Sequence, residues 1–300
     1  MKILKFGGTS VGTPQRMKDV CQLITDGERK IVVLSAMSGT TNSLVEIADY
    51  IKKKNLEGAG SVINKLRTLY RTHVSELYSK QENVEHTDNL LNDIFMHLHD
   101  LTTKPYSTAL EKEILAQGEL MSTNMVTNYL KECGIKVMLI PALDYMRTDA
   151  NSEPDMSFIK ENLSHILEKN SGYDLYITQG FICRNINGEI DNLQRGGSDY
   201  TACLIGAVLH ADEIQIWTDI DGMHNNDPRF VEGTTPVRQL NFEEAAELAY
   251  FGAKILHPTC IQPSHYAGVP GRLLNTMDPS APGTIINDQM QKGTIKAVAA

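Results

Sequence analysis

The feature that most constrains this chain is the alternation of short β-branched runs with longer helical patterns. Runs typical of strands cover residues 3–6, 31–34, 136–140, 175–178, 214–218 and 272–274. Between them, apolar residues recur at helical spacing after the Thr13-Pro14 pair, around 44–51, twice within 61–101, and over 110–133 and 200–210. Because neighbouring parallel strands need crossover connections, this alternation predicts an α/β fold with a mainly parallel central sheet covered by helices.

One segment departs from this alternation. Asn187-Gly188 separates the short runs Phe181-Ile182 and Glu189-Ile190. Asn-Gly favours a two-residue hairpin turn, because both central positions of that turn require a positive φ. We therefore expect an antiparallel β-hairpin inserted into the otherwise parallel fold.

Charge and cysteine content narrow the classes of function. The 300 residues contain 28 Lys and Arg against 37 Asp and Glu, which gives a net charge of −9. This balance argues against non-specific binding to nucleic acid or to an anionic membrane, while a local basic pocket for phosphate stays compatible with it. The five cysteines are widely spaced without a C-x-x-C pair, which argues against a disulfide framework or a zinc knuckle. Since no run resembles a signal peptide or a membrane span, we expect a cytoplasmic protein.

Ligands of open parallel sheets bind beyond the carboxyl ends of the strands, so the segments at those ends are candidates for chemistry. The first is Lys5-Phe6-Gly7-Gly8, which matches neither a dinucleotide-binding fingerprint nor a Walker A loop. A lysine beside bare glycine amides forms a suitable cradle for phosphate. A structural tight turn with a surface lysine is the competing interpretation, and this segment alone does not decide between them.

Two further segments combine charge with turn-forming residues. In Arg195-Gly196-Gly197-Ser198-Asp199, a guanidinium and unhindered amides precede a helix, and helix N-termini bind anions. Asp199 is alternatively a simple N-cap of that helix. After the strand predicted over 214–218, Asp219 and Asp221 either form a turn or orient a nucleotide and its Mg²⁺.

Other features give weaker signals. Lys254 interrupts an apolar face near the end of the chain. His97 and His99 would lie on different faces of a helix, which argues against a metal site between them. No G-x-S-x-G turn is present, and nothing in the sequence indicates a covalent nucleophile.

Taken together, these segments resemble the aspartate kinases of the amino acid kinase superfamily. The resemblance rests on several runs that occur in the family's order over essentially the whole chain. They are Lys5-Phe6-Gly7-Gly8-Thr9-Ser10-Val11, Gly118-Glu119-Leu120-Met121-Ser122, Gln179-Gly180-Phe181-Ile182, Arg195-Gly196-Gly197-Ser198-Asp199-Tyr200-Thr201, Trp217-Thr218-Asp219, Asp227-Pro228-Arg229 and Phe251-Gly252-Ala253-Lys254.

The resemblance implies a three-layer α/β/α sandwich with two lobes. Residues 1–292 would form the catalytic domain, with an aspartate-binding lobe over about 1–200 and a nucleotide-binding lobe over about 201–292. Residues 293–300 would begin a linker to regulatory ACT domains that this chain lacks. A homo-oligomer is compatible with the family.

The resemblance also implies an enzyme that transfers the γ-phosphoryl group of MgATP to the side-chain carboxylate of L-aspartate. The product is 4-phospho-L-aspartate, on the route to lysine, threonine and methionine. ATP would be the cofactor, with Mg²⁺ bound mainly through the ATP phosphates. This chemistry fits the absence of a nucleophile motif, because a carboxylate is already ionised at pH 7 and needs no general base.

Roles for individual residues follow from the same resemblance. Lys5 would hold the transferring phosphoryl group, and Asp199 would orient Lys5. The aspartate site would consist of Ser35, Thr41, Glu119, Arg195 and Ser198, with Glu119 on the α-ammonium and Arg195 on the α-carboxylate. The nucleotide site would consist of Lys5, Gly7, Gly8, Thr218, Asp219, His224, Arg229 and Lys254, and no residue is assigned to a metal ion.

Three positions depart from the family pattern. Gln194 stands where a glycine usually precedes Arg-Gly-Gly, which changes how that turn closes. His224 stands where a tyrosine is common, and its imidazole is a smaller ring. Gly271 stands where the strand usually carries a β-branched residue, which weakens the strand locally.

Two alternative functions stay open. One is another kinase of the superfamily, acting on glutamate, acetylglutamate, carbamate or UMP. The other is a catalytically silent sensor of an amino acid or a nucleotide. The segment 195–199 together with Glu119 favours a free amino acid, and the presence of both Lys5 and Asp199 argues against a silent sensor.

Overall fold

The computed structural model describes residues 1–193, 196–226, 231–251, 258–290 and 296–297. Its centre is a β-sheet in the strand order β3-β4-β2-β1-β7-β9-β10-β8. Among the described strands of this sheet, every pairing is parallel except that of β9 with β10. The strands are β1 Lys2–Phe6, β2 Lys30–Leu34, β3 Val137–Ile140, β4 Leu175–Gln179, β7 Glu213–Thr218, β8 Gln239–Asn241, β9 Gly271–Asn275 and β10 Thr284–Asn287.

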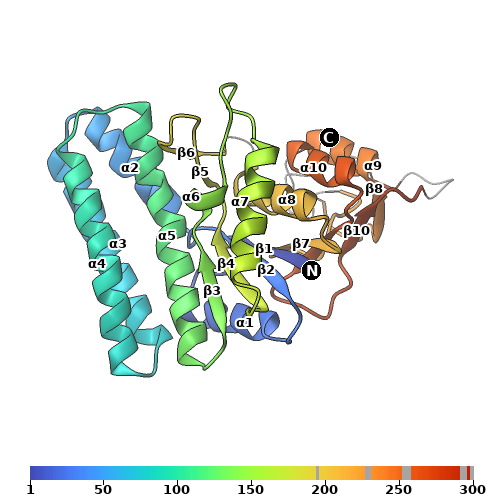
Figure 1. The fold of residues 1–300 in the computed structure, drawn as a ribbon, viewed down its shortest axis with the longest axis horizontal. Coiled ribbons are helices and arrows are strands. Elements are labelled where there is room, and N and C mark those ends of the chain that lie inside the picture. The colour runs from blue at the N-terminus through green and yellow to red at the C-terminus, as the bar shows by residue number, and fades with distance from the viewer. Residues whose placement is uncertain (194–195, 227–230, 252–257, 291–295, 298–300) are drawn as a thin grey trace.

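Helices connect these strands and lie on both faces of the sheet. They are α1 Pro14–Ile24, α2 Thr40–Lys52, α3 Leu56–Leu77, α4 Gln81–Thr102, α5 Thr108–Glu132, α6 Ala142–Tyr145, α7 Met156–Lys169, α8 Gly197–Leu209, α9 Phe242–Phe251 and α10 Pro258–Ala267. Figure 1 shows α3 and α4 side by side at one end of the molecule and α9 and α10 at the other. Within the described ranges, no helix is both long and apolar enough to span a membrane.

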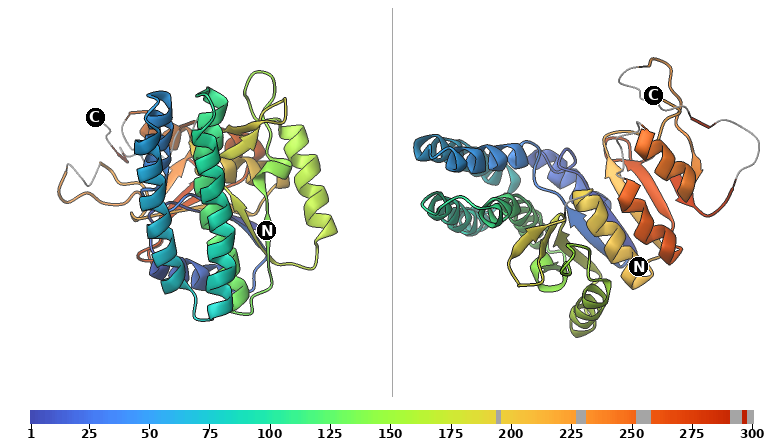
Figure 2. Two further views of the ribbon diagram at one scale, coloured as in Figure 1. Left: turned by 90° about the vertical axis from the view of Figure 1, so that its left-hand side faces the viewer. Right: turned by 90° about the horizontal axis from the view of Figure 1, so that it is seen from above.

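Two buried clusters hold the three layers together. Successive strand residues point to opposite faces of a sheet, so Leu4 packs with residues of α1 to α5, while Ile3 packs with residues of α7, α8 and α10. All five residues of β2 are buried, because helices cover this central strand on both faces. The predicted α/β/α sandwich with a mainly parallel sheet is therefore confirmed, and Figure 2 shows the helical layers from two further directions.

Most predicted elements occur where the sequence places them. Thr13 is the N-cap of α1, and its side chain accepts a hydrogen bond from the Arg16 amide. The helix predicted over 110–133 is α5, which ends at the C-cap Cys133, just before Gly134 with φ 75°. The short strands β8 and β10 and the helices α6, α7, α9 and α10 were not predicted from the sequence.

The predicted hairpin is also present. Its strands are β5 Ile182–Arg184 and β6 Ile190–Asn192, which pair antiparallel and form a small sheet of their own. Gly188 has a φ of 82°, but Asn187 has no positive φ, so the turn is not of the expected two-residue type. The Asn185 amide donates to the Glu189 carbonyl at 2.9 Å and closes a longer turn. The hairpin lies between β4 and α8, so it leads the chain into the segment before that helix.

At one position, the buried face of α3 differs from the helical pattern in the sequence. The spacing of Val62, Leu66 and Leu69 suggests that all three face the core. However, Leu69 is 43% exposed, and its neighbour Tyr70 is fully buried in its place. Tyr70 packs edge-on against Phe95 of α4, with ring centroids 5.9 Å apart.

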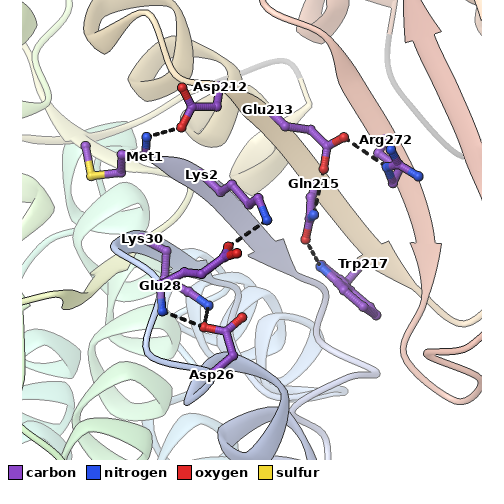
Figure 3. Close-up of polar contacts among 10 residues, drawn as sticks. All are labelled: Met1, Lys2, Asp26, Glu28, Lys30, Asp212, Glu213, Gln215, Trp217 and Arg272. Carbon is purple, nitrogen blue, oxygen red and sulfur yellow. Dashed lines mark hydrogen bonds and ion pairs between the residues drawn. The ribbon is translucent and has the colours of Figure 1, made fainter.

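Ion pairs gather around the amino ends of the central strands (Figure 3). The α-ammonium of Met1 pairs with Asp212, and Lys2 lies 2.6 Å from Glu28. Across from them, Arg272 of β9 lies 2.9 Å from Glu213 of β7. These pairs tie neighbouring strands together at the end of the sheet opposite Lys5.

Candidate active site

Lys5 and Asp199 form an ion pair at the carboxyl end of the central strands. In the register of the sheet, Lys5 stands between Val33 of β2 and Ile216 of β7. Its Nζ atom lies 2.7 Å from Oδ1 of Asp199, and the two side chains are 12% and 16% exposed. The interpretation of Lys5 as a surface lysine is therefore wrong, because the ammonium is largely covered and faces a carboxylate.

Asp199 belongs to the first turn of α8 and is not its N-cap. The N-cap is Gly196, with φ 75°, and Gly197 follows with φ 50°. The helix thus begins three residues earlier than the sequence predicts. A carboxylate in the first turn is favoured by the helix dipole. The Asp199 side chain is consequently directed towards Lys5 by a helix that begins at two glycines.

The glycine turn after β1 lies against the loop after β2. The Gly7 amide donates to the carbonyl of Trp217 at 3.3 Å, and the Ser38 amide donates to the carbonyl of Gly8 at 3.1 Å. A Cβ at Gly8 would lie only 2.8 Å from the carbonyl oxygen of Ala36. Glycine at position 8 is therefore required for the two loops to approach this closely.

A pocket of about 260 Å³ opens beside these loops. It is lined by Gly8, Ser35, Ala36, Met37, Ser38, Gly39, Thr41, Glu119, Phe181, Gly197 and Ser198. Four residues predicted for the aspartate site, namely Ser35, Thr41, Glu119 and Ser198, share this pocket. They come from the loop after β2, from α2, α5 and α8, so the fold gathers them from distant parts of the chain.

Glu119 is a buried acid in the wall of this pocket. Its Oε1 atom accepts a hydrogen bond from the Ala36 amide at 3.1 Å, and the residue is only 5% exposed. Burial raises the pKa of Glu119 to about 7, against the smaller opposing effects of hydrogen bonds from backbone amides and of the Lys5 charge. Near neutral pH, this group is thus poised between its neutral and charged forms.

Close packing joins α5 and α8 to the strand ends. A Cβ at Gly118 would lie 2.8 Å from Cβ of Ala36, and a Cβ at Gly180 would lie 2.3 Å from Cβ of Ser198. Glycine at both positions lets the helices reach the loops that line the pocket.

Hydrogen bonds from serine hydroxyl groups also link the loop after β2 to α5 and α8. Ser35 Oγ donates to Ser198 Oγ at 2.9 Å, and Ser122 Oγ donates to the Ser35 carbonyl at 2.8 Å. Ser122, Gly180 and Phe181 lie in runs that carry the family resemblance, yet no role is predicted for them from the sequence. Their place within those runs was the available signal.

The predicted nucleotide residues of β7 lie next to the glycine turn. Thr218 ends β7, and its Oγ1 atom donates to Oδ1 of Asp219 at 3.2 Å. The Thr276 amide donates to the Thr218 carbonyl at 2.7 Å, and the Thr276 hydroxyl lies 2.8 Å from the hydroxyl of Ser10. The turn after β1 and the ends of β7 and β9 are thereby joined.

His224 and Asp221 both make contacts that hold the loop after β7. Nδ1 of His224 lies 3.0 Å from Oγ1 of Thr234, so the half-buried ring is not a purely solvent-facing side chain. Asp221 pairs with Arg238 at 2.9 Å and accepts a hydrogen bond from the Gly283 amide at 3.2 Å. These contacts support the interpretation of Asp221 as a residue that forms the turn.

Some predicted site residues cannot be placed. Arg195, Arg229 and Lys254 lie outside the described residues, as does Gln194. Within the part of the chain that the structure describes, no three His, Cys, Asp or Glu side chains gather in an arrangement suited to a metal ion.

Comparison with known proteins gives consistent matches over most of the chain. The model of the amino acid kinase family matches residues 1–275. Lysine-sensitive aspartokinase 3 of Escherichia coli (strain K12) is 35% identical over 291 residues, which cover 95% of this chain and 63% of that protein. The chloroplastic aspartokinase 1 of Arabidopsis thaliana is 34% identical, with 95% of this chain and 51% of that protein covered.

A solved structure is similar as well. The crystal structure of E. coli aspartokinase III in complex with aspartate and ADP matches with a TM-score of 0.85 and 31% sequence identity. The match covers 97% of this chain and 65% of that chain. This chain therefore spans between half and two thirds of the length of these relatives.

Proposed function

The chain belongs to the amino acid kinase family, and we propose that it transfers the γ-phosphoryl group of ATP to the side-chain carboxylate of L-aspartate. The observation that carries this proposal is the pocket shared by Ser35, Thr41, Glu119 and Ser198, beside the pair Lys5–Asp199. The relatives named aspartokinase support the acceptor, and the similar crystal structure contains aspartate and ADP. The product would be 4-phospho-L-aspartate, a precursor of lysine, threonine and methionine.

On the acceptor side, two charged residues would hold the α-ammonium and the α-carboxylate of the amino acid. The carboxylate form of Glu119 suits the α-ammonium, and Arg195, from the segment before α8, suits the α-carboxylate as a bidentate donor. The hydroxyl groups of Ser35, Thr41 and Ser198 are available to fix the remaining orientation. The acceptor carboxylate is ionised at neutral pH, so the reaction requires no general base.

On the phosphoryl side, this chain contributes positive charge and backbone amides. Lys5 would hold the transferring group, and Asp199 would keep the ammonium directed to it. Gly8 and the N-terminus of α8, which begins at two glycines, add an environment that favours anions. Bound MgATP supplies the phosphoryl group and the divalent charge that offsets its negative charge. These residues would fit such an anion, because Lys5 supplies a cation at the strand end and α8 begins at glycines that carry no side chain.

The two lobes would divide the substrates between them. Residues 1–200 would bind aspartate, and residues 201–292 would bind the nucleotide, within a catalytic domain spanning 1–292. Thr218, Asp219, His224, Arg229 and Lys254 are the proposed nucleotide contacts. Thr218 and Asp219 follow Trp217, which pairs with Phe6, the residue after Lys5, in the register of the sheet.

A hydroxylamine trap tests the proposed function. Hydroxylamine converts an acyl phosphate into a stable hydroxamate, so the chain is incubated with MgATP and either L-aspartate or L-glutamate. We expect ATP-dependent hydroxamate with aspartate and little with glutamate, because the extra methylene misplaces the carboxylate. Preferential turnover of glutamate would contradict the proposed acceptor. Turnover of neither amino acid would contradict the proposed activity.

A further inference from the structure

The buried hydroxyl of Tyr70 contacts the start of the helix that carries Thr41. The side-chain oxygens of Tyr70 and Thr40 lie 2.9 Å apart, and both residues are at most 1% exposed. Tyr70 belongs to α3, while Thr40 is the first residue of α2. The bond therefore connects α3 to the start of α2, whose next residue, Thr41, lines the acceptor pocket.

The first turn of α2 has no side-chain cap of its own. Its N-cap is Gly39, with φ 82°, which provides no side chain to cap the helix. The Thr40 amide donates to the Met37 carbonyl at 3.0 Å, and the next residue, Thr41, lines the pocket. Since its cap is a glycine, the first turn of α2 needs other partners to fix its orientation.

Thr40 is held between two helices. A Cβ at Gly118 of α5 would lie 3.4 Å from the methyl carbon of Thr40, so α5 passes close on one side. On the other side, Tyr70 contacts the Thr40 hydroxyl and is itself supported by the edge of Phe95. Burial raises the pKa of the Tyr70 hydroxyl above its usual range, so the group stays protonated at any working pH.

We propose that Tyr70 is a positioning residue for the acceptor: its hydroxyl holds the first turn of α2 so that Thr41 faces the bound amino acid. This inference rests on the proposed function for the identity of the acceptor. It adds a residue from a helix that does not line the pocket. Tyr70 acts through Thr40 and does not itself touch the substrate.

The test compares two matched Tyr→Phe variants. Tyr70→Phe removes the hydroxyl at the site loop. Tyr78→Phe removes another buried hydroxyl at the end of α3, which donates to the Met125 carbonyl at 2.7 Å and lies away from the pocket. We expect Tyr70→Phe to raise the KM for aspartate by about 2- to 10-fold, as expected for the loss of one hydrogen bond, with the KM for ATP unchanged. Tyr78→Phe should leave both KM values unchanged. Equal KM values for aspartate in the two variants would overturn the proposal.

A second measurement does not depend on turnover. Hydrogen exchange of the first amides of α2, including Ser43, which donates to the Gly39 carbonyl, should be faster in Tyr70→Phe than in Tyr78→Phe. Thr40→Val should accelerate the exchange of the same amides. The double variant should exchange little faster than either single variant, because both substitutions remove the same hydrogen bond. Exchange at the parent rate in Tyr70→Phe would overturn the proposal. A parent chain without aspartate turnover would contradict the proposed function, whereas the exchange data would still decide the role of Tyr70.

Discussion

The ammonium of Lys5 lies 2.7 Å from a carboxylate oxygen of Asp199, and this pair joins the end of β1 to the first turn of α8. A lysine that approaches a transferring phosphoryl group must keep one direction while charge moves, and a covered carboxylate fixes that direction. The pair is thus suited to orient the cation and not only to stabilise the fold.

Asp199→Asn should lower kcat by about 10- to 100-fold, the range expected when a hydrogen bond between charged groups loses one charge. The KM for ATP should change little, because the ammonium is still present. Steady-state kinetics with varied ATP measure both values. As a control, Asp155→Asn removes a carboxylate that pairs with Arg147 at 2.5 Å, away from the pocket, and should keep kcat. Equal kcat values in the two variants would contradict the orienting role.

Glu119→Gln should chiefly weaken the binding of aspartate. The change keeps the shape of the side chain and removes the charge proposed to pair with the α-ammonium. We expect the KM for aspartate to rise by about 10- to 100-fold, with the KM for ATP nearly unchanged. A rise in the KM for ATP alone would show that Glu119 belongs to the nucleotide site instead.

Binding of aspartate should also depend on pH through Glu119. Burial raises the pKa of this group to about 7, and only its ionised form attracts the α-ammonium. The KM for aspartate should therefore fall as the pH rises from about 6 to 8. Glu119→Gln should flatten this profile, and a parent profile that is already flat would contradict the assignment.

The raised pKa of Glu119 also affects the stability of the fold. Here a rising pH is unfavourable, whereas it favours the binding of aspartate. The carboxyl group ordinarily ionises near 4.5 and in the folded chain near 7, so between these values the folded state holds more protons than the unfolded state. Stability contributed by this group is thus present below about pH 4.5 and lost as the pH rises through 7. The effect of Glu119→Gln on the free energy of unfolding should be more favourable at pH 8 than at pH 5, by on the order of 1–3 kcal/mol. Urea unfolding of the parent and the variant at both pH values measures this difference.

Gly271→Ala should stabilise the chain by about 0.5–1 kcal/mol. Gly271 begins β9 without a positive φ, and an added Cβ would meet its nearest neighbours, Ile286 and the Ile214 carbonyl, at 3.8 and 3.9 Å. The added methyl group also fills part of a small cavity of about 20 Å³. Gly206→Ala is the control, because its Cβ would lie 2.4 Å from the Ile214 side chain and should bring no such gain. Urea unfolding of the two variants measures the difference.

Much of the fold could be predicted because strand ends and glycine turns are local signals. The run Lys5-Phe6-Gly7-Gly8 identifies a strand that ends in a tight turn, and Thr13-Pro14 identifies the helix after it. The pairing of Lys5 with Asp199 was not a local signal. It depends on β1 lying between β2 and β7, with α8 packed over them. The resemblance to a family suggested this pair, whereas the spacing of residues along the chain did not.

Other features were missed because tertiary packing decides between adjacent residues. Leu69 and Tyr70 both continue a helical pattern from Leu66, and only the position of α4 determines that Tyr70 is buried. Asp199 has the properties of an N-cap, yet α8 begins at Gly197 because Gly196 adopts a left-handed conformation. The strands β8 and β10, of three and four residues, are too short to give a clear alternation of apolar and polar residues.

Comparison of the parent chain with Lys5→Ala tests most directly whether Lys5 stabilises the phosphoryl group as it passes to aspartate. Hydroxamate formed from aspartate and MgATP reports turnover. Fluorescence of Trp217, the single tryptophan, reports nucleotide binding, because its ring stacks on Phe6 and its carbonyl accepts the Gly7 amide. We predict that Lys5→Ala lowers kcat by about 10²–10³-fold, while the fluorescence titration with ATP stays within about threefold of the parent. A variant with the parent kcat and only a weaker affinity for ATP would contradict the account.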